Sequence, residues 1–440
     1  MKIDLIEFNA RRQALMARMS GGIAIIPTAA EAIRNRDSHY PYRFDSYFYY
    51  LTGFTEPESV LVLVAGDAAQ GIAPKSILFC RDKDLEREIW DGFRFGADAA
   101  REAFGFDEAY SIHELDNVVL KLLAVQPQLF FSLGASASWD SRVIGWMNSL
   151  RSQARSGASV PNAIADISKL IDSMRLIKSP FEQTLMRQSA TIAAAAHNRA
   201  MQFTQPDMME YEVEAEFLHE FYRRGAQAPA YTSIVAGGAN ACTLHYNANN
   251  ARLNAGDLLL IDAGCELDGY ASDITRTFPV HGKFSAAQKD VYALVLAAQT
   301  AAIAKVNTQS HWNEPHDAAL AVLIQGFIDL KLCSGSAESV LESGAYRQFY
   351  MHRTGHWLGL DVHDAGEYKD TQANWLMLQP GMALTVEPGC YIRPAQNVPE
   401  ALWNIGIRIE DDVLVTTDGC EVITAAAVKS VAEIEALMKR

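Results

Sequence analysis

Two aspartates in one apolar segment are the residues of this chain best placed to do chemistry. Asp262 and Asp273 lie in LLLIDAGCELDGYASDITRTF, which predicts two strands joined by a turn. If residues 266–269 form a four-residue loop, Asp262 faces Asp273 directly across the strand pair. Facing side chains lie about 5 Å apart, and like charges at that distance destabilise a sheet. The pair therefore predicts cations between the carboxylates, unless one aspartate is a turn or edge residue in another register.

Two further segments carry candidate ligands. HRTGHWLGLDVHD concentrates three of the eleven histidines: His352, His356 and His363. Single histidines are more often core or surface residues, but this density predicts that at least one binds a metal or takes part in catalysis. MALTVEPGCY places Glu387 at the end of a strand, directly before Pro388. Because proline interrupts the backbone ladder, Glu387 belongs either to a site beside the turn or to a solvated strand end.

The segment NIGIRIEDD has the alternation of a strand. Its three isoleucines point to one face, and Arg408 and Glu410 point to the other. Taken alone, this second face predicts an exposed Arg–Glu pair.

Considered together, these segments indicate a metal site rather than an exposed Arg–Glu pair. Four carboxylates and one imidazole can neutralise two divalent ions, and oxygen-rich sets with one nitrogen suit Mn²⁺, with Co²⁺ or Fe²⁺ as alternatives. The absence of thiols from the set argues against a structural zinc site. The five side chains are Asp262, Asp273, His356, Glu387 and Glu410.

The elements that must position these residues indicate two domains. The 440 residues exceed a typical single core. Helical and strand-like segments alternate up to about residue 150, and the small, polar stretch 152–163 predicts a surface loop. We place the boundary near residues 172–176 and predict domains 1–174 and 175–440. Ser179 and Pro180 begin a strong helix, and helices followed by strands occur twice after it, which suggests pseudo-twofold symmetry.

Charge and cysteine usage exclude several classes of protein. The net charge of −15 disfavours nucleic acid or an anionic membrane as a partner. None of the six cysteines forms a CxxC pair, so they are expected to be buried thiols in a reducing compartment. The charged N-terminal segment has no secretory apolar core, and no apolar run reaches membrane-spanning length. We expect a cytoplasmic protein.

The ordered ligand series, with its surrounding strings, resembles the pita-bread metallopeptidase family and, within it, the aminopeptidase P (Xaa-Pro aminopeptidase) branch. RNRDSHYPYRFDSYFYYLTGF resembles the amino-terminal domain of that branch, and GGANACTLHY, GHWLGLDVHD, TVEPGCY and GIRIED resemble its catalytic domain. The resemblance implies an α/β two-domain fold. A creatinase-like α/β domain would precede a pita-bread catalytic domain, an α+β fold with pseudo-twofold symmetry.

The resemblance also implies a reaction and a set of roles. Two Mn²⁺ ions, with Co²⁺, Fe²⁺ or Zn²⁺ as substitutes, would share a hydroxide that attacks the residue before a proline at position 2 of a peptide. Asp262 and Asp273 would bind one ion, His356 and Glu387 would join Asp273 at the other, and Glu410 would bridge them. Glu387 would also accept a proton.

Residues around the ions receive roles by the same similarity. His245 and His363 would stabilise the oxyanion and help protonate the proline nitrogen, while Arg408 would steady Glu410. His352 and Tyr391 would line the substrate pocket. A homo-oligomer, dimer or tetramer, is expected, in which Asp37 and Trp90 reach a neighbouring subunit's site.

Three alternatives stay open from the residues alone. A prolidase, or Xaa-Pro dipeptidase, has the same fold and ligands and needs a cation for the carboxylate of the dipeptide, which we cannot locate in one sequence. A creatinase-like hydrolase without metal would lack the full carboxylate set. A non-catalytic binding protein on the same fold would have no reason to keep the ligands and the neighbouring histidines.

Overall fold

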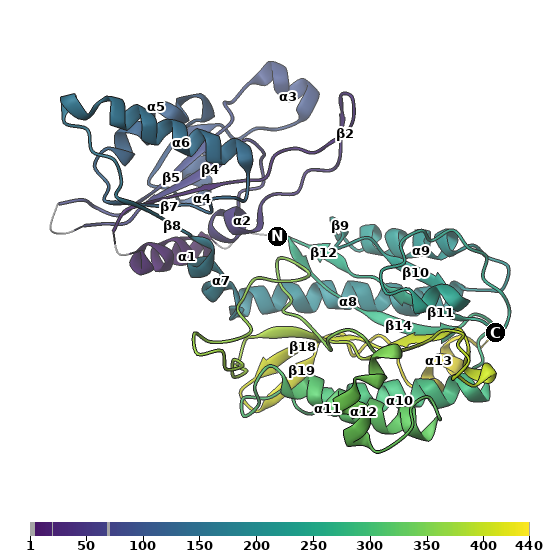
Figure 1. The fold of residues 1–440 in the computed structure, drawn as a ribbon. Coiled ribbons are helices and arrows are strands. Elements are labelled where there is room, and N and C mark those ends of the chain that lie inside the picture. The colour runs from purple at the N-terminus through teal and green to yellow at the C-terminus, as the bar shows by residue number, and fades with distance from the viewer. Residues whose placement is uncertain (1–4, 20, 68–70, 440) are drawn as a thin grey trace. The chain divides into compact units, whose positions relative to one another are not determined.

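Figure 1 shows the computed structural model, which describes residues 5–19, 21–67 and 71–439 of the chain. The chain divides into two compact units, Met1–Met174 and Arg175–Arg440. No helix within the described residues is long and apolar enough to cross a membrane.

The N-terminal unit is built on a six-stranded mixed sheet with the order β6-β5-β4-β1-β7-β8. Its central strands are continuous apolar runs that are almost wholly buried, as expected where helices cover both faces. The strands are β1 (Ile23–Pro27), β4 (Val60–Val64), β5 (Lys75–Cys80), β6 (Glu108–Ser111), β7 (Gln128–Phe130) and β8 (Ala163–Ala165), and a separate pair is formed by β2 (Ile33–Asn35) and β3 (Ser38–His39). The helices are α1 (Leu5–Arg18), α2 (Ser46–Thr52), α3 (Leu85–Asp91), α4 (Ala97–Phe104), α5 (Leu115–Leu123), α6 (Ala137–Ser152) and α7 (Ser168–Arg175).

The C-terminal unit places helices on both sides of its strands (Figure 1). Helix α8 (Pro180–Phe203) begins at a capping box between Ser179 and Glu182, and α10 (Ala286–Ile303) begins at the same motif on Ser285. Helices α8 and α9 (Glu210–Arg223) lie on one side, and α10, α11 (Glu314–Asp329) and α12 (Ala337–Ser343) lie on the other. Helix α13 (Val431–Leu437) ends the chain.

The strands between these helices form small sheets rather than one large sheet. Their orders are β10-β11-β14, β13-β12-β9, β15-β18-β19 and β16-β17. The bounds are β9 (Ala228–Pro229), β10 (Ile234–Gly237), β11 (Leu258–Asp262), β12 (Cys265–Leu267), β13 (Tyr270–Ala271), β14 (Thr275–Pro279), β15 (Ala383–Val386), β16 (Gly389–Ile392), β17 (Ile405–Arg408), β18 (Asp411–Thr416) and β19 (Gly419–Val422). The predicted succession of helices followed by strands occurs twice, with α8 and α9 before the first set of strands and three helices, α10 to α12, before the second.

The predicted register of the aspartate hairpin is wrong by two residues. The loop has two residues, Asp268 and Gly269, and both have positive φ, 47° and 83°. Asp-Gly favours this tight type I′ geometry over a four-residue loop. Asp262 therefore pairs with Thr275 rather than with Asp273. Because a shift of two residues preserves the face of a strand, both aspartates still point to the same side.

Candidate active site

Four carboxylates converge because each lies at the end of a strand. Asp262 ends β11, Asp273 precedes β14, Glu387 follows β15, and Glu410 lies between β17 and β18. The backbone N–H of Glu410 donates to the carbonyl of Thr275 at 3.1 Å, which ties the ends of two strands together. At strand ends the ladder stops, and the side chains are free to turn into a shared site.

His356 joins this cluster from a segment that runs beside β15. Its backbone N–H donates to Thr385 Oγ1 at 3.2 Å, and its carbonyl accepts from the backbone of Thr385 at 3.0 Å. Nδ1 lies 2.9 Å from the carbonyl of Trp357, so this nitrogen carries the proton and Nε2 is left for the cluster. Nε2 lies 3.4 Å from Asp273 and 3.7 Å from Glu387.

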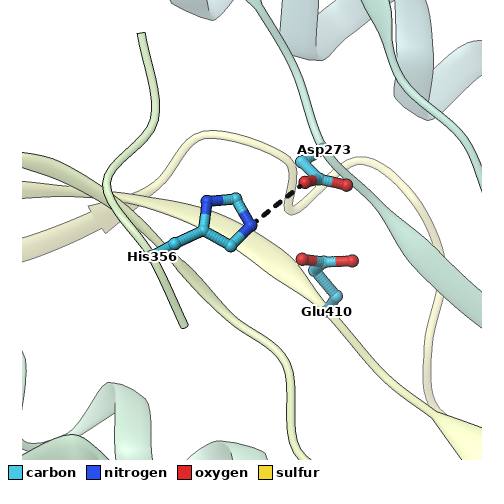
Figure 2. Close-up of side chains that lie close together, drawn as sticks. All are labelled: Asp273, His356 and Glu410. Atoms are coloured by element: carbon cyan, nitrogen blue, oxygen red, sulfur yellow. Dashed lines mark ion pairs between the residues drawn. The ribbon is translucent and has the colours of Figure 1, made fainter. Parts of the chain in front are cut away.

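Figure 2 shows Asp273, His356 and Glu410 pointing toward one another from three separate segments. One ligand atom from each of the three lies within 4.8 Å of the others, which is the spacing of groups that hold a metal ion. Among the described residues, these three thus form a group that could hold a metal ion.

Burial and mutual repulsion make this cluster unfavourable without cations. Burial, reinforced by the charge of Asp262, raises the pKa of Asp273. Burial raises the pKa of Glu387 to about 7, and burial together with the neighbouring carboxylates raises that of Glu410 well above its usual range. Burial alone would lower the pKa of His356, but the neighbouring carboxylates raise it to about 9. Divalent cations would relieve this repulsion, so the donor set fits two such ions.

Tyr231 is a member of the site that the sequence analysis missed. Its buried hydroxyl donates to Asp262 Oδ1 at 2.5 Å and also contacts Asp273 Oδ1. Burial and these carboxylates raise the pKa of the phenol well above its usual range, so it stays a donor. Tyr231 lies shortly before β10, and the long-range pairing of β10 with β11, which sets Ile234 opposite Asp262, brings it to the site, so no local pattern in the sequence could have found it.

Arg408 contacts a different carboxylate from the one expected. Its Nη2 donates to Asp262 at 2.6 Å, and its Nε donates to Thr275 Oγ1 at 3.0 Å. Thr275 in turn donates to Glu410 at 2.6 Å, so among the described residues this hydroxyl links Arg408 to Glu410 by hydrogen bonds. The two-residue shift in the hairpin register explains why Arg408 contacts Asp262 instead of Glu410. With this shift Thr275 pairs with Asp262, and its hydroxyl lies between Arg408 and Glu410. The face that carries Arg408 and Glu410 is buried rather than exposed.

A cavity of about 740 Å³ opens in front of the cluster. His245, His352 and His363 line it together with all five predicted ligands. The ring of His363 packs against that of His356, with centroids 4.2 Å apart. Burial and the neighbouring His356 and His245 lower the pKa of His363, so its ring is neutral more often than that of a free histidine.

Tyr391 lies behind the cavity wall rather than on it. Its hydroxyl is 2.8 Å from His352 Nε2 and accepts from Arg408 Nη1 at 3.0 Å. Burial, with help from Arg408, lowers the pKa of His352 to about 4, so this ring is neutral at pH 7. Tyr391 therefore contacts a residue that lines the cavity, His352, but does not line the cavity itself.

His245 lies in a turn after β10, and a buried carboxylate holds this segment in place. Glu210, the first residue of α9, accepts from the backbone of Gly237 at 2.8 Å and from that of Ala251 at 2.8 Å. Tyr246, the neighbour of His245, donates to the same carboxylate at 2.7 Å. A carboxylate at a helix N-terminus is also stabilised by the helix dipole.

The two predicted residues of the N-terminal unit are exposed. Asp37 lies in the turn between β2 and β3, and Trp90 lies on α3 with 83% of its surface exposed. Every charged residue that lines the cavity comes from the C-terminal unit. Both side chains are accessible on the surface of their own unit.

Comparison with known proteins agrees with this geometry. The profile of Metallopeptidase family M24 matches residues 184–417, and that of the Aminopeptidase P, N-terminal domain matches residues 8–130. The chain is similar to the Xaa-Pro aminopeptidase of Escherichia coli (strain K12), with 44% identity over 438 residues that cover 99% of this chain and 98% of the relative.

The similarity to solved structures covers the residues of both units. Aminopeptidase PepP of Pseudomonas aeruginosa matches with a TM-score of 0.96 and 49% identity over 99% of this chain and 98% of that chain. Zinc-substituted Escherichia coli aminopeptidase P in complex with product matches with a TM-score of 0.96 and 44% identity over 100% of this chain and 99% of that chain. The two-domain fold, an α/β unit followed by a pita-bread unit, is confirmed.

Proposed function

Because the chain belongs to metallopeptidase family M24, we propose that it is a metal-dependent aminopeptidase that removes the N-terminal residue from peptides with proline at position 2. The observation that carries this proposal is the convergence of four carboxylates and His356 on one cavity, within the residues that match the family profile. The relatives named Xaa-Pro aminopeptidase supply the substrate class.

We assign the metal ligands as Asp262, Asp273, His356, Glu387 and Glu410. When bound, two divalent ions would lower the pKa of a water and polarise the carbonyl that precedes proline. The side chains around them perform the remaining work, and each can be assigned from its contacts.

Glu387 lines the cavity and is our choice for the group that accepts a proton from the attacking water. As water adds to the carbonyl carbon, negative charge develops on the carbonyl oxygen, and the exposed rings of His245 and His363 can stabilise it. The C–N bond to proline then breaks. The proline nitrogen carries no hydrogen in the peptide, so it must receive a proton, which we assign to these two histidines.

Arg408, Tyr231 and His352 are assigned as groups that orient the site. Arg408 and Tyr231 both donate to Asp262, and this fixes the direction in which the carboxylate presents its oxygens. His352, backed by Tyr391, forms a neutral wall of the cavity against which we place the proline ring.

The decisive experiment is a short peptide panel with and without metal. Protein stripped with chelator and then supplied with Mn²⁺ should cleave Xaa-Pro-Pro tripeptides and release free Xaa, while the stripped protein should not. Preference for Xaa-Pro dipeptides would indicate a prolidase instead. Protein that binds no metal and cleaves neither peptide would indicate a binding protein.

We further propose manganese as the native metal, a homo-oligomer as the assembled form and the cytoplasm as its location. The oxygen-rich donor set supports manganese, and the six cysteines are free, as is usual in a reducing compartment. Exposed Asp37 and Trp90 are accessible to a neighbouring subunit, where we assign them to its substrate. Reconstitution with Mn²⁺, Co²⁺, Fe²⁺ and Zn²⁺, and sedimentation of the loaded protein, test the first two points.

A further inference from the structure

His363 lies in a segment without regular secondary structure. Its side chain is exposed, and within the described part of the chain its ring makes no hydrogen bond. The ring packs against that of His356. The position of the imidazole over the metal ligands therefore depends on the irregular segment 359–364, and the anchor of that segment decides where His363 lies.

The anchor is Asp364, the next residue in the chain. Its side chain is 1% exposed and accepts from Arg175 Nη2 at 2.5 Å on one oxygen and from Lys178 Nζ at 2.9 Å on the other. The backbone N–H of Asp361 adds a third donor at 3.2 Å. Although burial opposes the charge, the two cations lower the pKa of Asp364, so the carboxylate stays ionised near neutral pH.

Both cations come from the start of the C-terminal unit, directly before helix α8. Arg175 and Lys178 are themselves almost wholly buried, and Arg175 also donates to Asp361 Oδ2 at 2.7 Å. The far end of the segment packs tightly on this cluster, because a Cβ at Gly359 would lie 2.3 Å from Asp364 Oδ2. Charge and packing thus hold residues 359–364 from both ends.

We propose that Arg175, Lys178 and Asp364 form an ion clamp whose function is to position His363 over the metal ligands. The inference rests on the proposed function, because it gives His363 a part in turnover. The alternative is a cluster that contributes only to folding, and buried ion pairs are weak evidence of stability by themselves. What separates the two is coupling: a positioning clamp acts through the imidazole, whereas a folding cluster does not.

The test is a double-mutant cycle between Asp364 and His363 in the full, Mn²⁺-loaded protein. Asp364→Asn keeps the shape but loses the charge, and it should lower kcat about 10–100-fold, since displacement of a catalytic group by about 1 Å can cost that much. Metal content and KM should change less than about twofold. In a His363→Ala background the same substitution should cost less than about threefold, because its effect passes through the missing ring.

Glu56→Gln is the matched control, because Glu56 is a buried carboxylate paired with Arg81 at 3.3 Å in the N-terminal unit. It should lower the melting temperature and leave kcat unchanged. If Asp364→Asn does not fold, Lys178→Gln, which retains Arg175, takes its place in the cycle. Equal losses in both backgrounds, or wild-type kcat in the single variant, would overturn the clamp. Wild-type protein that cleaves no Xaa-Pro peptide would instead overturn the proposed function.

Discussion

The proposed metal ligands and the two proposed catalytic histidines line the same cavity but are held in different ways. The four carboxylates lie at strand ends, and His356 lies on a segment paired with β15, so backbone ladders place all five. His245 and His363 lie in irregular segments that are tied down by Glu210 and Asp364. The proposed ligands are therefore positioned by strand pairing, and the histidines by buried carboxylates that hold their loops.

This difference has a consequence for mutation. Loss of a ligand should remove the ions and with them the reaction, whereas loss of a loop histidine should leave the ions in place and slow the reaction. Changes to the sheet itself should act on stability first. The predictions below separate these three behaviours, beginning with the greatest effect.

The largest effect is expected for Glu410→Ala. Glu410 is 1% exposed and lies within ligand distance of Asp273 and His356, so its removal takes a shared carboxylate from the centre. We expect metal content to fall and hydrolysis of Xaa-Pro-Pro to drop to background, measured by elemental analysis and product release. Glu421→Ala on β19, where the partner is the surface residue Arg187, is the control and should keep both. Wild-type turnover in the Glu410 variant would contradict the assignment of ligands.

His363→Ala tests the loop histidines rather than the proposed metal ligands. We expect kcat to fall about 10²–10⁴-fold, the usual range for loss of a positioned proton donor, while metal content stays at the wild-type level. His113→Ala, at a histidine that is 83% exposed in the N-terminal unit, should have no effect. A simultaneous loss of metal would mean that the loop histidines and the ligands form one unit, and the distinction drawn above would fail.

Gly264→Ala should damage the sheet that carries the aspartates. A Cβ at Gly264 would lie 1.7 Å from the carbonyl oxygen of Ser272, so the two halves of the hairpin must separate. We expect a loss of about 3 kcal/mol in the free energy of unfolding, at the upper end for overpacking, measured by urea titration of the metal-free protein. Gly145→Ala in helix α6, where nothing lies within 4 Å, should be neutral or slightly stabilising.

The contrast between local signals and long-range contacts explains which features could be predicted from the sequence. The two-domain fold and the strands that carry the ligands could be predicted, because alternation and capping motifs are local signals. The hairpin register was wrong because an Asp-Gly turn of two residues was assigned four. The Arg175–Asp364 pair joins residues 189 positions apart, and no local pattern reports such a contact.

The smallest effect is expected at a histidine that contacts the backbone just after strand β11. His197 on α8 is fully buried, and its Nε2 lies 3.0 Å from the carbonyl of Ala263, the residue after Asp262. Within the described chain its Nδ1 has no hydrogen-bond partner, so the ring is neutral with the proton on Nε2. Burial lowers its pKa from 6.5 to about 3. This ring therefore stays neutral in the folded protein down to about pH 3.

Its effect on stability therefore has a definite sign. Between pH 6.5 and about 3 the unfolded chain binds a proton at His197 that the folded chain does not, so acid favours unfolding. The stabilisation is complete above pH 6.5 and decreases by about 1.4 kcal/mol per pH unit below it. His197→Gln keeps an N–H donor for Ala263 but cannot titrate. We expect the difference in unfolding free energy between wild type and variant to shrink by this slope from pH 6 to pH 4, in urea titrations of metal-free protein. A difference that does not change with pH would mean that the His197 ring is already protonated in the folded state. Its buried Nδ1–H would then have no hydrogen-bond acceptor among the described residues.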